Sequence, residues 1–356
     1  MELKRTPLER EHLSLGAKMG EFAGWSMPIE YEGTLKEHRA VREDVGIFDL
    51  THLGKIDVQG EGAGGWLQRV LSNDLEKVGV GGAQYNLVLT DDGGIVDDVI
   101  AYRLAERDWL VVPNAANTSA VLEALRAETR ADVVVNHRPD LTTIAVQGPR
   151  SIDLVTPLVP EVSSLASMAC TTGTYREAAF PVARSGYTGE KGVELFAPEG
   201  IAPALWRDLV EAGAVPVGLA ARDTLRLEMG YALHGNDIGP DRDPVEAMLT
   251  WACALDTDFV GRDAVAKAKE AGPARRLRGL RMRDRRIPRP HQDVYRGEER
   301  VGETTSGTFS PTLKIGIAMA YLDADITPGD TVGVDVRGKR GEAEVVKPPF
   351  VDASPK

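Results

Sequence analysis

Residues Asp91 to Leu104 read DDGGIVDDVIAYRL, a turn followed by a strand that carries two carboxylates. The first four residues are typical of a tight turn, because aspartate hydrogen-bonds its own backbone and glycine accepts positive φ. From Ile95 onward both faces of the expected strand are largely apolar. An unpaired carboxylate in apolar surroundings is costly or takes up a proton, so we expect at least one aspartate to be held away from bulk water.

Asp98 is the better candidate for a functional carboxylate, because Tyr102 lies two steps further along on the same face. A carboxylate kept among apolar and aromatic neighbours is a common source of a proton acceptor tuned toward neutral pH. The alternative is structural, with Asp97 and Asp98 paired to arginine or capping a neighbouring turn. The stretch alone leaves both interpretations open.

Composition sets the broad class of the protein. The chain has 356 residues, enough for two or three domains, and its 42% hydrophobic and 27% charged content is typical of a soluble globular protein. No apolar run approaches the roughly 20 residues that a membrane span needs. The start, MELKRTPLEREHL, resembles neither a secretory signal nor a transit peptide. We expect a cytoplasmic protein, or the mature form of an imported one, with no membrane partner.

Charge and cysteine usage exclude further classes. A formal net charge of −12 argues against nucleic acid as the main partner, since that binding depends on neutralising phosphates. Cys170 and Cys253 are too few and too isolated for a zinc knuckle, an iron–sulfur site or a disulfide framework, and they fit a reducing compartment. His52 lacks partners at metal-ligand spacing, so a structural role is expected, with a ligand or base as the alternative.

The glycine-rich stretch GEGAGG, residues 60–65, matches the pattern G-x-G-x-x-G. We reject the dinucleotide interpretation, because the preceding KIDV is not a buried first strand and Glu61 would face the pyrophosphate. The chain has no G-x-x-x-x-G-K-[ST] loop either. Nucleotide triphosphates are therefore disfavoured as ligands.

Strands and helices alternate over the first three quarters of the chain, which indicates an α+β domain with a largely antiparallel sheet. Strands are predicted within 47–60, 81–90, 95–104, 109–114, 133–136, 143–147 and 175–196, the last range holding two strands around a turn at 187–190. Helices are predicted from Thr34, where Thr34 and Glu37 match a capping box, and from Trp66, Asn114, near Pro149, Ile201 and Gly218, with a final pair at 244–255 and 261–272.

Two charged segments have open interpretations. The helix from Gly218 carries Arg222, Asp223, Arg226 and Glu228, for which a solvated face is the commoner case and a site the alternative. Beyond Gly272, eight arginines fall between Arg275 and Arg289, and short strands with glycine and proline turns follow. This region predicts a separate small β-barrel or jelly roll. Its arginine run is either a solvated domain edge or a surface for an acidic partner.

Taken together, the motifs resemble those of the glycine cleavage T-protein family, the tetrahydrofolate-dependent aminomethyltransferases. The resemblance covers essentially the whole chain, in the family's order: RTPL, EFAGWSMP, HRAVREDVGIFDLTHLG, GGIVDDVIAY, NAAN, QGP, SGYTGEKGVEL, GLAARDTLRLE, LHGNDI and TSGTFSPTL. It implies a three-lobed fold, with two interleaved α+β subdomains in residues 1–272 and a C-terminal β-barrel domain in residues 275–356.

The resemblance also implies a site. Asp98 is the second aspartate of the family's GGI[IV]DD motif and would be the catalytic residue. The implied folate contacts are Tyr85, Tyr102, Asn114, Tyr187, Glu194 and Arg222. Aromatic faces would stack on the pterin, Glu194 would accept its amino and amide N–H groups, and Arg222 would pair with an anionic group or hold the glutamate.

The implied reaction takes an aminomethyl group from the dihydrolipoyl arm of the partner H protein, releases ammonia and places the methylene on tetrahydrofolate. Asp98 would accept a proton from a folate amine as it attacks. No metal is expected, although the acidic cluster Asp91, Asp92, Asp97 and Asp98 keeps that alternative open.

Two departures and two competing readings accompany the resemblance. Ser167-Met168-Ala169 stands where relatives often carry an aromatic pair, and the C-terminus KPPFVDASPK lacks a tyrosine that some relatives have.

A related folate-dependent demethylase, acting on an N- or S-methyl donor, is the enzymatic alternative. The folate-binding iron–sulfur assembly or RNA-modification factors of the same fold carry a cysteine in K-G-C-Y-x-G-Q-E, whereas this chain has SGYTGEKG there.

Overall fold

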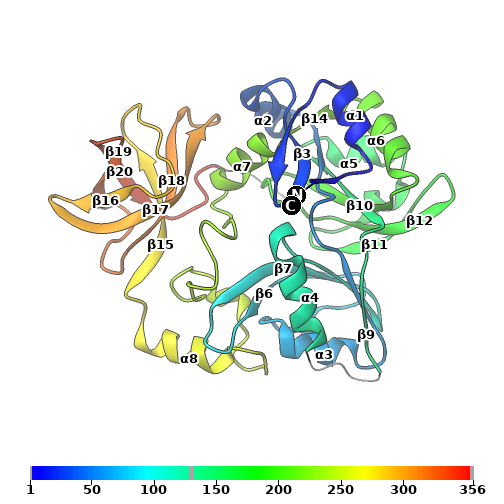
Figure 1. The fold of residues 1–356 in the computed structure, drawn as a ribbon, viewed down its shortest axis with the longest axis horizontal. Helices are drawn as coiled ribbons and strands as arrows, with labels where there is room; N and C mark the ends of the chain where they lie inside the picture. Colours follow the sequence, from blue (N-terminus) through cyan, green and yellow to red (C-terminus); the bar gives the residue numbers. More distant parts are fainter. Residues whose placement is uncertain (1, 128–131, 353–356) are drawn as a thin grey trace.

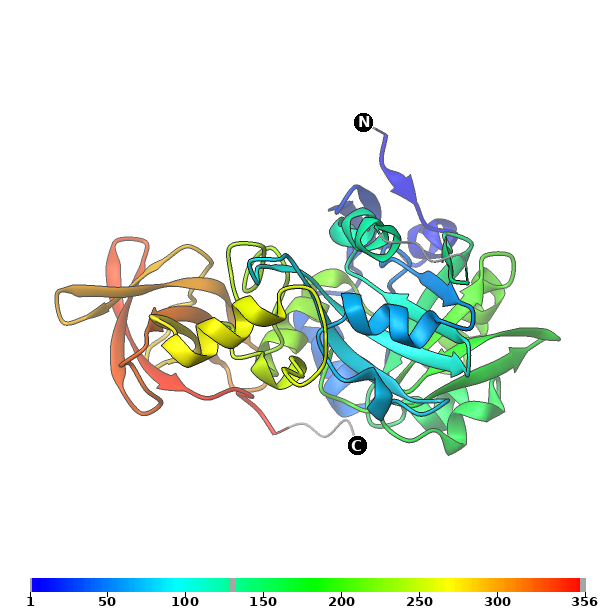
Figure 2. The same ribbon diagram turned by 90° about the horizontal axis from the view of Figure 1, so that it is seen from below.

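The computed structural model describes residues 2–127 and 132–352. Three lobes are visible in Figure 1: two α+β units lie one above the other, and a β-barrel stands beside them. Figure 2 shows the barrel at one end of the molecule, and in Figure 1 helix α8 (Arg262–Ala271) lies below the barrel, beside the lower α+β unit. The three-lobed fold expected from the resemblance is thereby confirmed. Within the described residues, no helix has the length and apolarity to cross a membrane.

The first unit is built on a six-stranded sheet with the order β11-β12-β13-β10-β4-β14. Its strands are β4 (Gly46–Asp49), β10 (Leu141–Gln147), β11 (Cys170–Tyr175), β12 (Ala178–Ala183), β13 (Gly192–Pro198) and β14 (Val215–Pro216). A small sheet beside it holds β1 (Lys4–Arg5), β2 (Lys18–Phe22) and β3 (Trp25–Glu30). The helical segments are α1 (Glu9–Ser14), α2 (Thr34–Glu43), α5 (Ser151–Val155), η3 (Pro160–Ser164), α6 (Ala202–Glu211) and α7 (Leu219–Glu228).

Helices cover both faces of this sheet, which is why every residue of β10 is buried. Ile144 and Val146 pack with Trp206 of α6 on one face. Ala145 packs with Leu225 of α7 on the other. The alternation follows the two-residue period of a strand.

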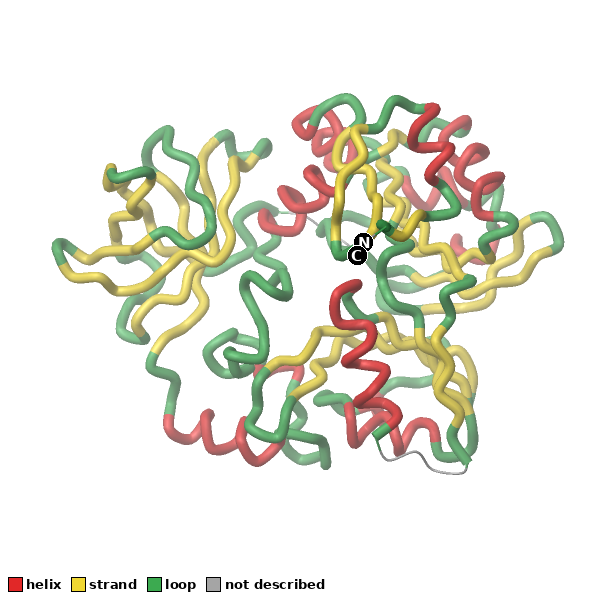
Figure 3. Tube along the Cα trace, viewed as in Figure 1, coloured by secondary structure: helices red, strands yellow, loops and turns green. Residues whose placement is uncertain are grey.

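The second unit has a five-stranded sheet with the order β6-β7-β8-β5-β9, in which every pair is antiparallel. The predicted antiparallel sheet is therefore confirmed. Its strands are β5 (Ile56–Gln59), β6 (Ala83–Leu89), β7 (Ile95–Ala105), β8 (Asp108–Val112) and β9 (Val134–His137). Its helical segments are α3 (Ala63–Val70), η1 (Leu75–Lys77), η2 (Ala115–Asn117) and α4 (Thr118–Arg126). Figure 3 shows α3 and α4 lying against this sheet, where they bury one apolar cluster.

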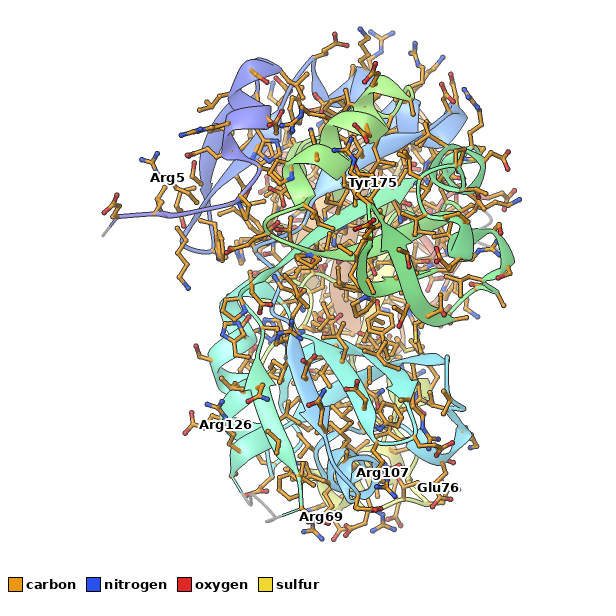
Figure 4. The ribbon with its side chains drawn as sticks, turned by 90° about the vertical axis from the view of Figure 1, so that its right-hand side faces the viewer. Arg5, Arg69, Glu76, Arg107, Arg126 and Tyr175 are labelled. Carbon is orange, nitrogen blue, oxygen red and sulfur yellow. The ribbon has the colours of Figure 1, made fainter. Side chains whose placement is uncertain are left out.

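The two units are interleaved along the chain. Strand β4 belongs to the first sheet, β5 to β9 form the second, and β10 returns to pair with β4. Figure 4 shows the units stacked, with Tyr175 on the upper and Arg107 on the lower. Tyr102 from the second sheet and Phe196 from the first meet in a shared apolar cluster. The two sheets are therefore built from alternating parts of the chain, and they share one interface.

The third lobe is a closed six-stranded barrel with the order β15-β18-β17-β16-β19-β20. Its strands are β15 (Arg275–Met282), β16 (Asp293–Arg296), β17 (Glu299–Ser310), β18 (Ile315–Asp323), β19 (Thr331–Val336) and β20 (Lys339–Val346). Leu280, Val294 and Ala318 are among the apolar side chains that fill it. Closure leaves no free sheet edge. The predicted barrel is confirmed.

The turn before β7 forms as its residues predict, and the fold explains its second glycine. Gly93 has φ of +88°, a conformation that glycine adopts readily. At Gly94, a β-carbon would lie 2.2 Å from the Pro240 carbonyl oxygen, so the position has no room for a side chain. The Ile95 N–H donates to the Gly239 and Arg242 carbonyls. The turn is therefore held against the segment that follows α7.

The register of the β6–β7 hairpin sends the two aspartates to opposite faces. Leu87 stands opposite Asp98, and Val88 stands opposite Asp97. Tyr85 lies two residues from Leu87 and therefore shares the face of Asp98. Asp97 projects toward the face covered by α4 and is fully buried.

Some predicted elements differ in the structure. Residues 244–255 form turns and a short 3-10 helix, η4 (Thr250–Ala252), in place of the predicted helix. The reason is tertiary: Met248 has φ of +61°, and the Glu246 carbonyl accepts from Leu277 of the barrel. Strand β11 was not predicted.

The predicted capping box at α2 is only half right. Gly33 is the residue that precedes the helix, and the Glu37 carboxylate accepts from its N–H at 3.0 Å. The Thr34 hydroxyl donates to Glu30 instead of capping the helix. The hydrogen bond from the Glu37 carboxylate back to the residue before the helix is therefore present. The hydrogen bond from the Thr34 side chain to the helix backbone, which a capping box also requires, is not.

The expectation of a solvated charged face on α7 is wrong for two of its four residues. Arg226 is 2% exposed and Glu228 is fully buried. Arg226 donates to Asp237 at 2.7 Å and to Ser306 of the barrel at 2.8 Å. These charges are buried because α7 lies between the first unit and the barrel.

The arginine run forms β15 and the loop after it. Some of its members pair with acids of the same chain, as in Arg275 with Glu246 at 2.7 Å and Arg283 with Glu342 at 2.8 Å. Arg275 also lies 5.0 Å from the centre of the Tyr321 ring. Arg275 therefore joins the barrel to the preceding segment, whereas Arg283 pairs within the barrel lobe. The position of Arg275 supports the interpretation of the run as a domain edge.

Candidate active site

Asp98 lies on β7, partly buried, with hydrogen-bond donors on both carboxylate oxygens. The Tyr85 hydroxyl donates to Oδ2 at 3.2 Å, and Asn114 Nδ2 donates to Oδ1 at 2.8 Å. Burial, followed by the negative charge of Asp97, raises the pKa of Asp98 to about 7, while the two hydrogen bonds oppose this shift. Asp98 is therefore a carboxylate that gains and loses a proton near neutral pH.

Asp97 is surrounded by N–H donors. Its Oδ2 accepts from the Asn114 backbone N–H at 2.9 Å, and its Oδ1 accepts from Asn114 Nδ2 at 2.9 Å and Asn117 Nδ2 at 2.7 Å. Burial raises the pKa of Asp97, and these hydrogen bonds act in the opposite direction. The carboxylate is thus fully desolvated but well satisfied.

Asn114 was predicted as a folate contact and as the start of a helix. It follows β8 and precedes η2. Its side-chain nitrogen donates to Asp97, to the Asp98 carboxylate and to the Asp98 carbonyl at 3.1 Å. The structure therefore uses the Asn114 amide nitrogen to hold both aspartates.

Tyr102 and Glu194 meet across the interface of the two sheets. The Tyr102 hydroxyl donates to Glu194 Oε2 at 2.9 Å, and Ser185 hydrogen-bonds both groups. Glu194 lies on β13 opposite Ala145 of β10. The structure thereby brings these two predicted residues together. Tyr102 shares the face of Asp98, but its hydroxyl is directed to Glu194.

Tyr187 and Arg222 form a second predicted pair. The Tyr187 ring stacks on Tyr231, with centroids 5.6 Å apart and planes at 27°, and its hydroxyl donates to the Ala232 carbonyl. The Arg222 guanidinium lies 4.8 Å from the centre of the Tyr187 ring. Within the described residues, no carboxylate lies at ion-pair distance from Arg222. Its cation is therefore available to a ligand.

Electrostatics link these groups into one site. The charge of Asp98 contributes to the raised pKa of Tyr85 and of Tyr187. Burial lowers the pKa of Arg222, and the nearby Tyr187 and Glu194 oppose that shift. The raised tyrosine pKa values, caused first by burial, keep both hydroxyls protonated as donors at neutral pH.

Trp251 belongs to the site but was not predicted. Its indole stacks on Tyr85, with centroids 5.1 Å apart and planes at 26°, and the residue is 63% exposed. It lies in η4, the segment mispredicted as a helix. An exposed tryptophan beside the Asp98–Tyr85 pair provides a flat apolar surface at the edge of the site. The only sequence signal was the residue type, which is also typical of packing.

His52 and Lys55 lie beneath the site on the β4–β5 connection. Burial, followed by the charge of Arg222, lowers the pKa of His52 to about 3, so its imidazole is neutral at physiological pH. The ring meets Phe22 edge to face at 5.3 Å. Lys55 Nζ donates to the Thr51 and Leu53 carbonyls at 2.8 and 2.9 Å. Burial lowers the pKa of Lys55 to about 8. This lysine holds the turn that carries His52.

The first departure from the family pattern, at Ser167-Met168-Ala169, lies beside the start of β6. Met168 has φ of +57° and is 37% exposed, and its carbonyl accepts from Ala83 at the start of β6. The C-terminal departure is only partly visible, since residues 353–356 lie outside the described part. In the described ranges, no group of three or more His, Cys, Asp or Glu side chains is arranged to hold a metal ion.

Comparisons with known proteins agree with this fold. The family described as "GCVT N-terminal domain" matches residues 8–257, and "Glycine cleavage T-protein C-terminal barrel domain" matches residues 275–352. An aminomethyltransferase of Mycobacterium avium is 48% identical over 360 residues, which cover 98% of this chain and 97% of the relative. An aminomethyltransferase of Frankia alni is 49% identical over 364 residues, covering 100% of both chains.

A solved structure gives the same result. The glycine cleavage system aminomethyltransferase T from Bartonella henselae superposes with a TM-score of 0.93, at 36% identity and 99% coverage of both chains. The two interleaved α+β units and the C-terminal barrel, together with full-length relatives that are aminomethyltransferases, identify an aminomethyltransferase. The chain belongs to the glycine cleavage T-protein family.

Proposed function

We propose that the protein transfers the methylene of an aminomethyl group, carried on the dihydrolipoyl arm of the H protein, to tetrahydrofolate. The products are ammonia, 5,10-methylenetetrahydrofolate and the free dihydrolipoyl arm. The observation that carries the proposal is Asp98, a desolvated carboxyl with a pKa of about 7 that faces an aromatic wall of Tyr85 and Trp251. Full-length relatives that are aminomethyltransferases support the same reaction class.

The groups around Asp98 suit the chemistry of a reduced pterin. The stacked pairs Tyr85–Trp251 and Tyr187–Tyr231 present flat aromatic surfaces to a planar ring. Glu194 offers carboxylate oxygens to the amino and amide N–H groups of the pterin. Arg222, which has no carboxylate at ion-pair distance among the described residues, supplies a cation for an oxygen or carboxylate of the same ligand.

In the proposed mechanism, Asp98 accepts a proton from a folate amine as that nitrogen bonds to the carbon of the aminomethyl group and the bond from this carbon to ammonia breaks. The second folate amine then bonds to the same carbon as the carbon–sulfur bond to the carrier breaks. The two amine protons end on ammonia and on the carrier thiol, so the two bonds formed balance the two bonds broken. A positioned base of this kind contributes about 10²–10⁴ in rate. Its pKa near the working pH suits the task, because the carboxylate is ionised in a large fraction of molecules and still basic enough to take a proton. Tyr85 and Asn114 keep the carboxylate in place.

The assignment of Tyr85, Tyr102, Asn114, Tyr187, Glu194 and Arg222 to folate, and of Asp98 to catalysis, belongs to this proposal. So does the division into a folate-binding domain at 1–272 and a barrel domain at 275–356, of which the last four residues lie outside the described part. A cytoplasmic location completes it. The buried free thiols of Cys170 and Cys253 support a reducing compartment.

The test is turnover by the wild-type protein with two donors. Tetrahydrofolate is mixed either with H protein carrying the aminomethylated dihydrolipoyl arm or with an N- or S-methyl donor, and ammonia and methylenetetrahydrofolate are followed. We expect stoichiometric ammonia and product with the carrier only. Formation of product from the methyl donor and none from the carrier would contradict this proposal and support the demethylase hypothesis.

A further inference from the structure

We propose that Asp97 is a positioning residue, which stays ionised beside Asp98 and by its negative charge sets the pH at which Asp98 becomes a proton acceptor. The inference rests on the proposed role of Asp98 and adds to it. Neither the family's motif nor the relatives assign a role to this first aspartate. Its basis is the hydrogen-bond geometry around the two carboxylates.

The surroundings of Asp97 favour its ionised form. Both carboxylate oxygens accept only N–H groups, from the backbone and side chain of Asn114 and from the side chain of Asn117, at 2.7 to 2.9 Å. An amide N–H group donates a hydrogen bond and cannot accept one from a protonated carboxyl. A protonated Asp97 would therefore lose at least one of these bonds. Hydrogen bonds of this type favour the charged form of a carboxyl.

The surroundings of Asp98 accommodate its protonated form more readily than those of Asp97 do. One of its donors is the Tyr85 hydroxyl, at the longer distance of 3.2 Å, and a hydroxyl oxygen can also accept a hydrogen bond from a protonated carboxyl. Asp98 is also partly exposed, whereas Asp97 is fully buried. When the pair holds one proton, that proton therefore resides on Asp98.

Asn114 couples the two groups. Its single side-chain nitrogen lies 2.9 Å from Asp97 Oδ1 and 2.8 Å from Asp98 Oδ1. Neighbouring residues of a strand normally point to opposite faces, so a donor shared by both carboxylates shows that their oxygens turn toward the same group. Like charges that share one donor disfavour simultaneous ionisation. The raised pKa of Asp98, for which the charge of Asp97 is the cause next after burial, agrees with the geometry.

Other titratable groups face the pair from the neighbouring elements. Tyr85 of β6 and Tyr187 of the β12–β13 connection both have raised pKa values, so they stay neutral through the relevant range. His234, whose Nε2 lies 3.2 Å from the Ile95 carbonyl oxygen, acts on Asp97 and favours its charged form. His234 is therefore the alternative source of a pH effect, and the experiment must separate it from Asp97.

The experiment measures the pH dependence of single-turnover product formation. Because Asp98 must be ionised to accept a proton, activity rises with pH through the pKa of Asp98. Removing the charge of Asp97 lowers that pKa, so Asp97→Asn should move the rise to lower pH by about one unit. Asp97→Ser, which is smaller and also uncharged, should do the same and serves if the asparagine variant does not fold.

Two controls define the specificity. Asp92→Asn removes an exposed carboxylate from the same hairpin, and His234→Gln removes the neighbouring imidazole. Asp92→Asn should leave the midpoint where it is in the wild type, and His234→Gln should not reproduce the downward shift of about one unit. A purely structural role for Asp97 would lower the rate at every pH without moving the midpoint, and that outcome would overturn the proposal.

A second readout does not require turnover. Infrared difference titration follows the protonated carboxyl of Asp98, identified by its loss in Asp98→Asn, and should show the same downward shift in Asp97→Asn. An unchanged midpoint for that carboxyl would refute the coupling. If the shift appears while the wild type transfers nothing from the carrier, the coupling stands and the proposed function fails instead.

Discussion

At the scale of single residues, Asp98 is a carboxylate that the fold holds at some cost. In the unfolded chain its pKa would be about 3.9, whereas burial and Asp97 raise it to about 7 in the fold. Between these values the folded state binds more protons than the unfolded state. Stability contributed by this group is therefore present below about pH 4 and is lost as pH rises through about 7.

Asp98→Asn should accordingly be more stable than the wild type at high pH. We expect a gain of about 1–3 kcal/mol at about pH 8 that disappears near pH 4, because the neutral amide pays no cost of ionisation in a buried place. Chemical denaturation at a series of pH values measures it. Asp92→Asn, at an exposed position of the same hairpin, should show no such gain. Equal stability of Asp98→Asn and the wild type at all pH values would mean that Asp98 is not desolvated.

Trp251 permits a prediction about binding alone. Trp251→Ala should weaken tetrahydrofolate binding by roughly 2- to 10-fold, the range expected for one aromatic contact. Folding should change little, since the side chain is 63% exposed. Fluorescence titration measures the affinity, and Leu35→Ala, at a residue 56% exposed on α2, is the matched control. An affinity equal to that of the wild type would remove Trp251 from the ligand surface.

At the scale of elements, the sequence predicted those turns and strands that neighbouring residues determine by themselves. The Asp91–Gly94 turn and the strand from Ile95 follow from residue types that specify a turn and a two-residue period. The prediction of a helix at 244–255 was wrong, because residues of this range make contacts with other segments instead. Glu246 alone binds Arg275 with its side chain and Leu277 with its carbonyl. Such contacts between distant segments are not encoded in periodicity.

Helix α7 provides the clearest test at this scale. Arg226→Met should destabilise the protein by about 3–5 kcal/mol, because it leaves the fully buried Asp237 without its cation. Arg207→Ala, which breaks an exposed pair with Glu11, should cost less than about 1 kcal/mol. Denaturation curves for both variants make the comparison. A similar small loss in each would show that Arg226 and Asp237 do not form a buried ion pair in solution.

At the scale of the whole molecule, the site exists because the chain crosses between the two units. Asp98 and Tyr102 come from the second sheet, Glu194 from the first, Arg222 from α7 and Trp251 from the segment that leads to the barrel. The sequence could indicate the type of each residue, and the family resemblance indicated their common site. Their mutual contacts were not predicted. The contact of Tyr102 with Glu194 depends on how the two units pack, and that of Asn114 with both aspartates depends on how β7 and the end of β8 lie together within the second unit.

Tyr102→Phe tests this assembly, because Tyr102 bonds across the interface between the units. We expect a loss of about 1–2 kcal/mol in unfolding free energy, since Glu194 loses a donor in a buried position. Folate affinity should fall as well, because Ser185 alone then orients the carboxylate. Tyr175→Phe removes a hydroxyl that donates to Asp208 in the first unit and should leave folate affinity unchanged. If Tyr102→Phe bound folate with the wild-type affinity, the contact between Tyr102 and Glu194 would have no role in ligand binding.

The central claim is that Asp98 accepts the proton during methylene transfer. It is tested most directly by the single-turnover rate of methylenetetrahydrofolate formation in Asp98→Asn and the wild type, both saturated with tetrahydrofolate and the aminomethylated carrier. The account predicts that the variant is slower by about 10²–10⁴, while its dissociation constant for tetrahydrofolate changes by less than about tenfold. A variant that forms product at the wild-type rate would contradict the claim.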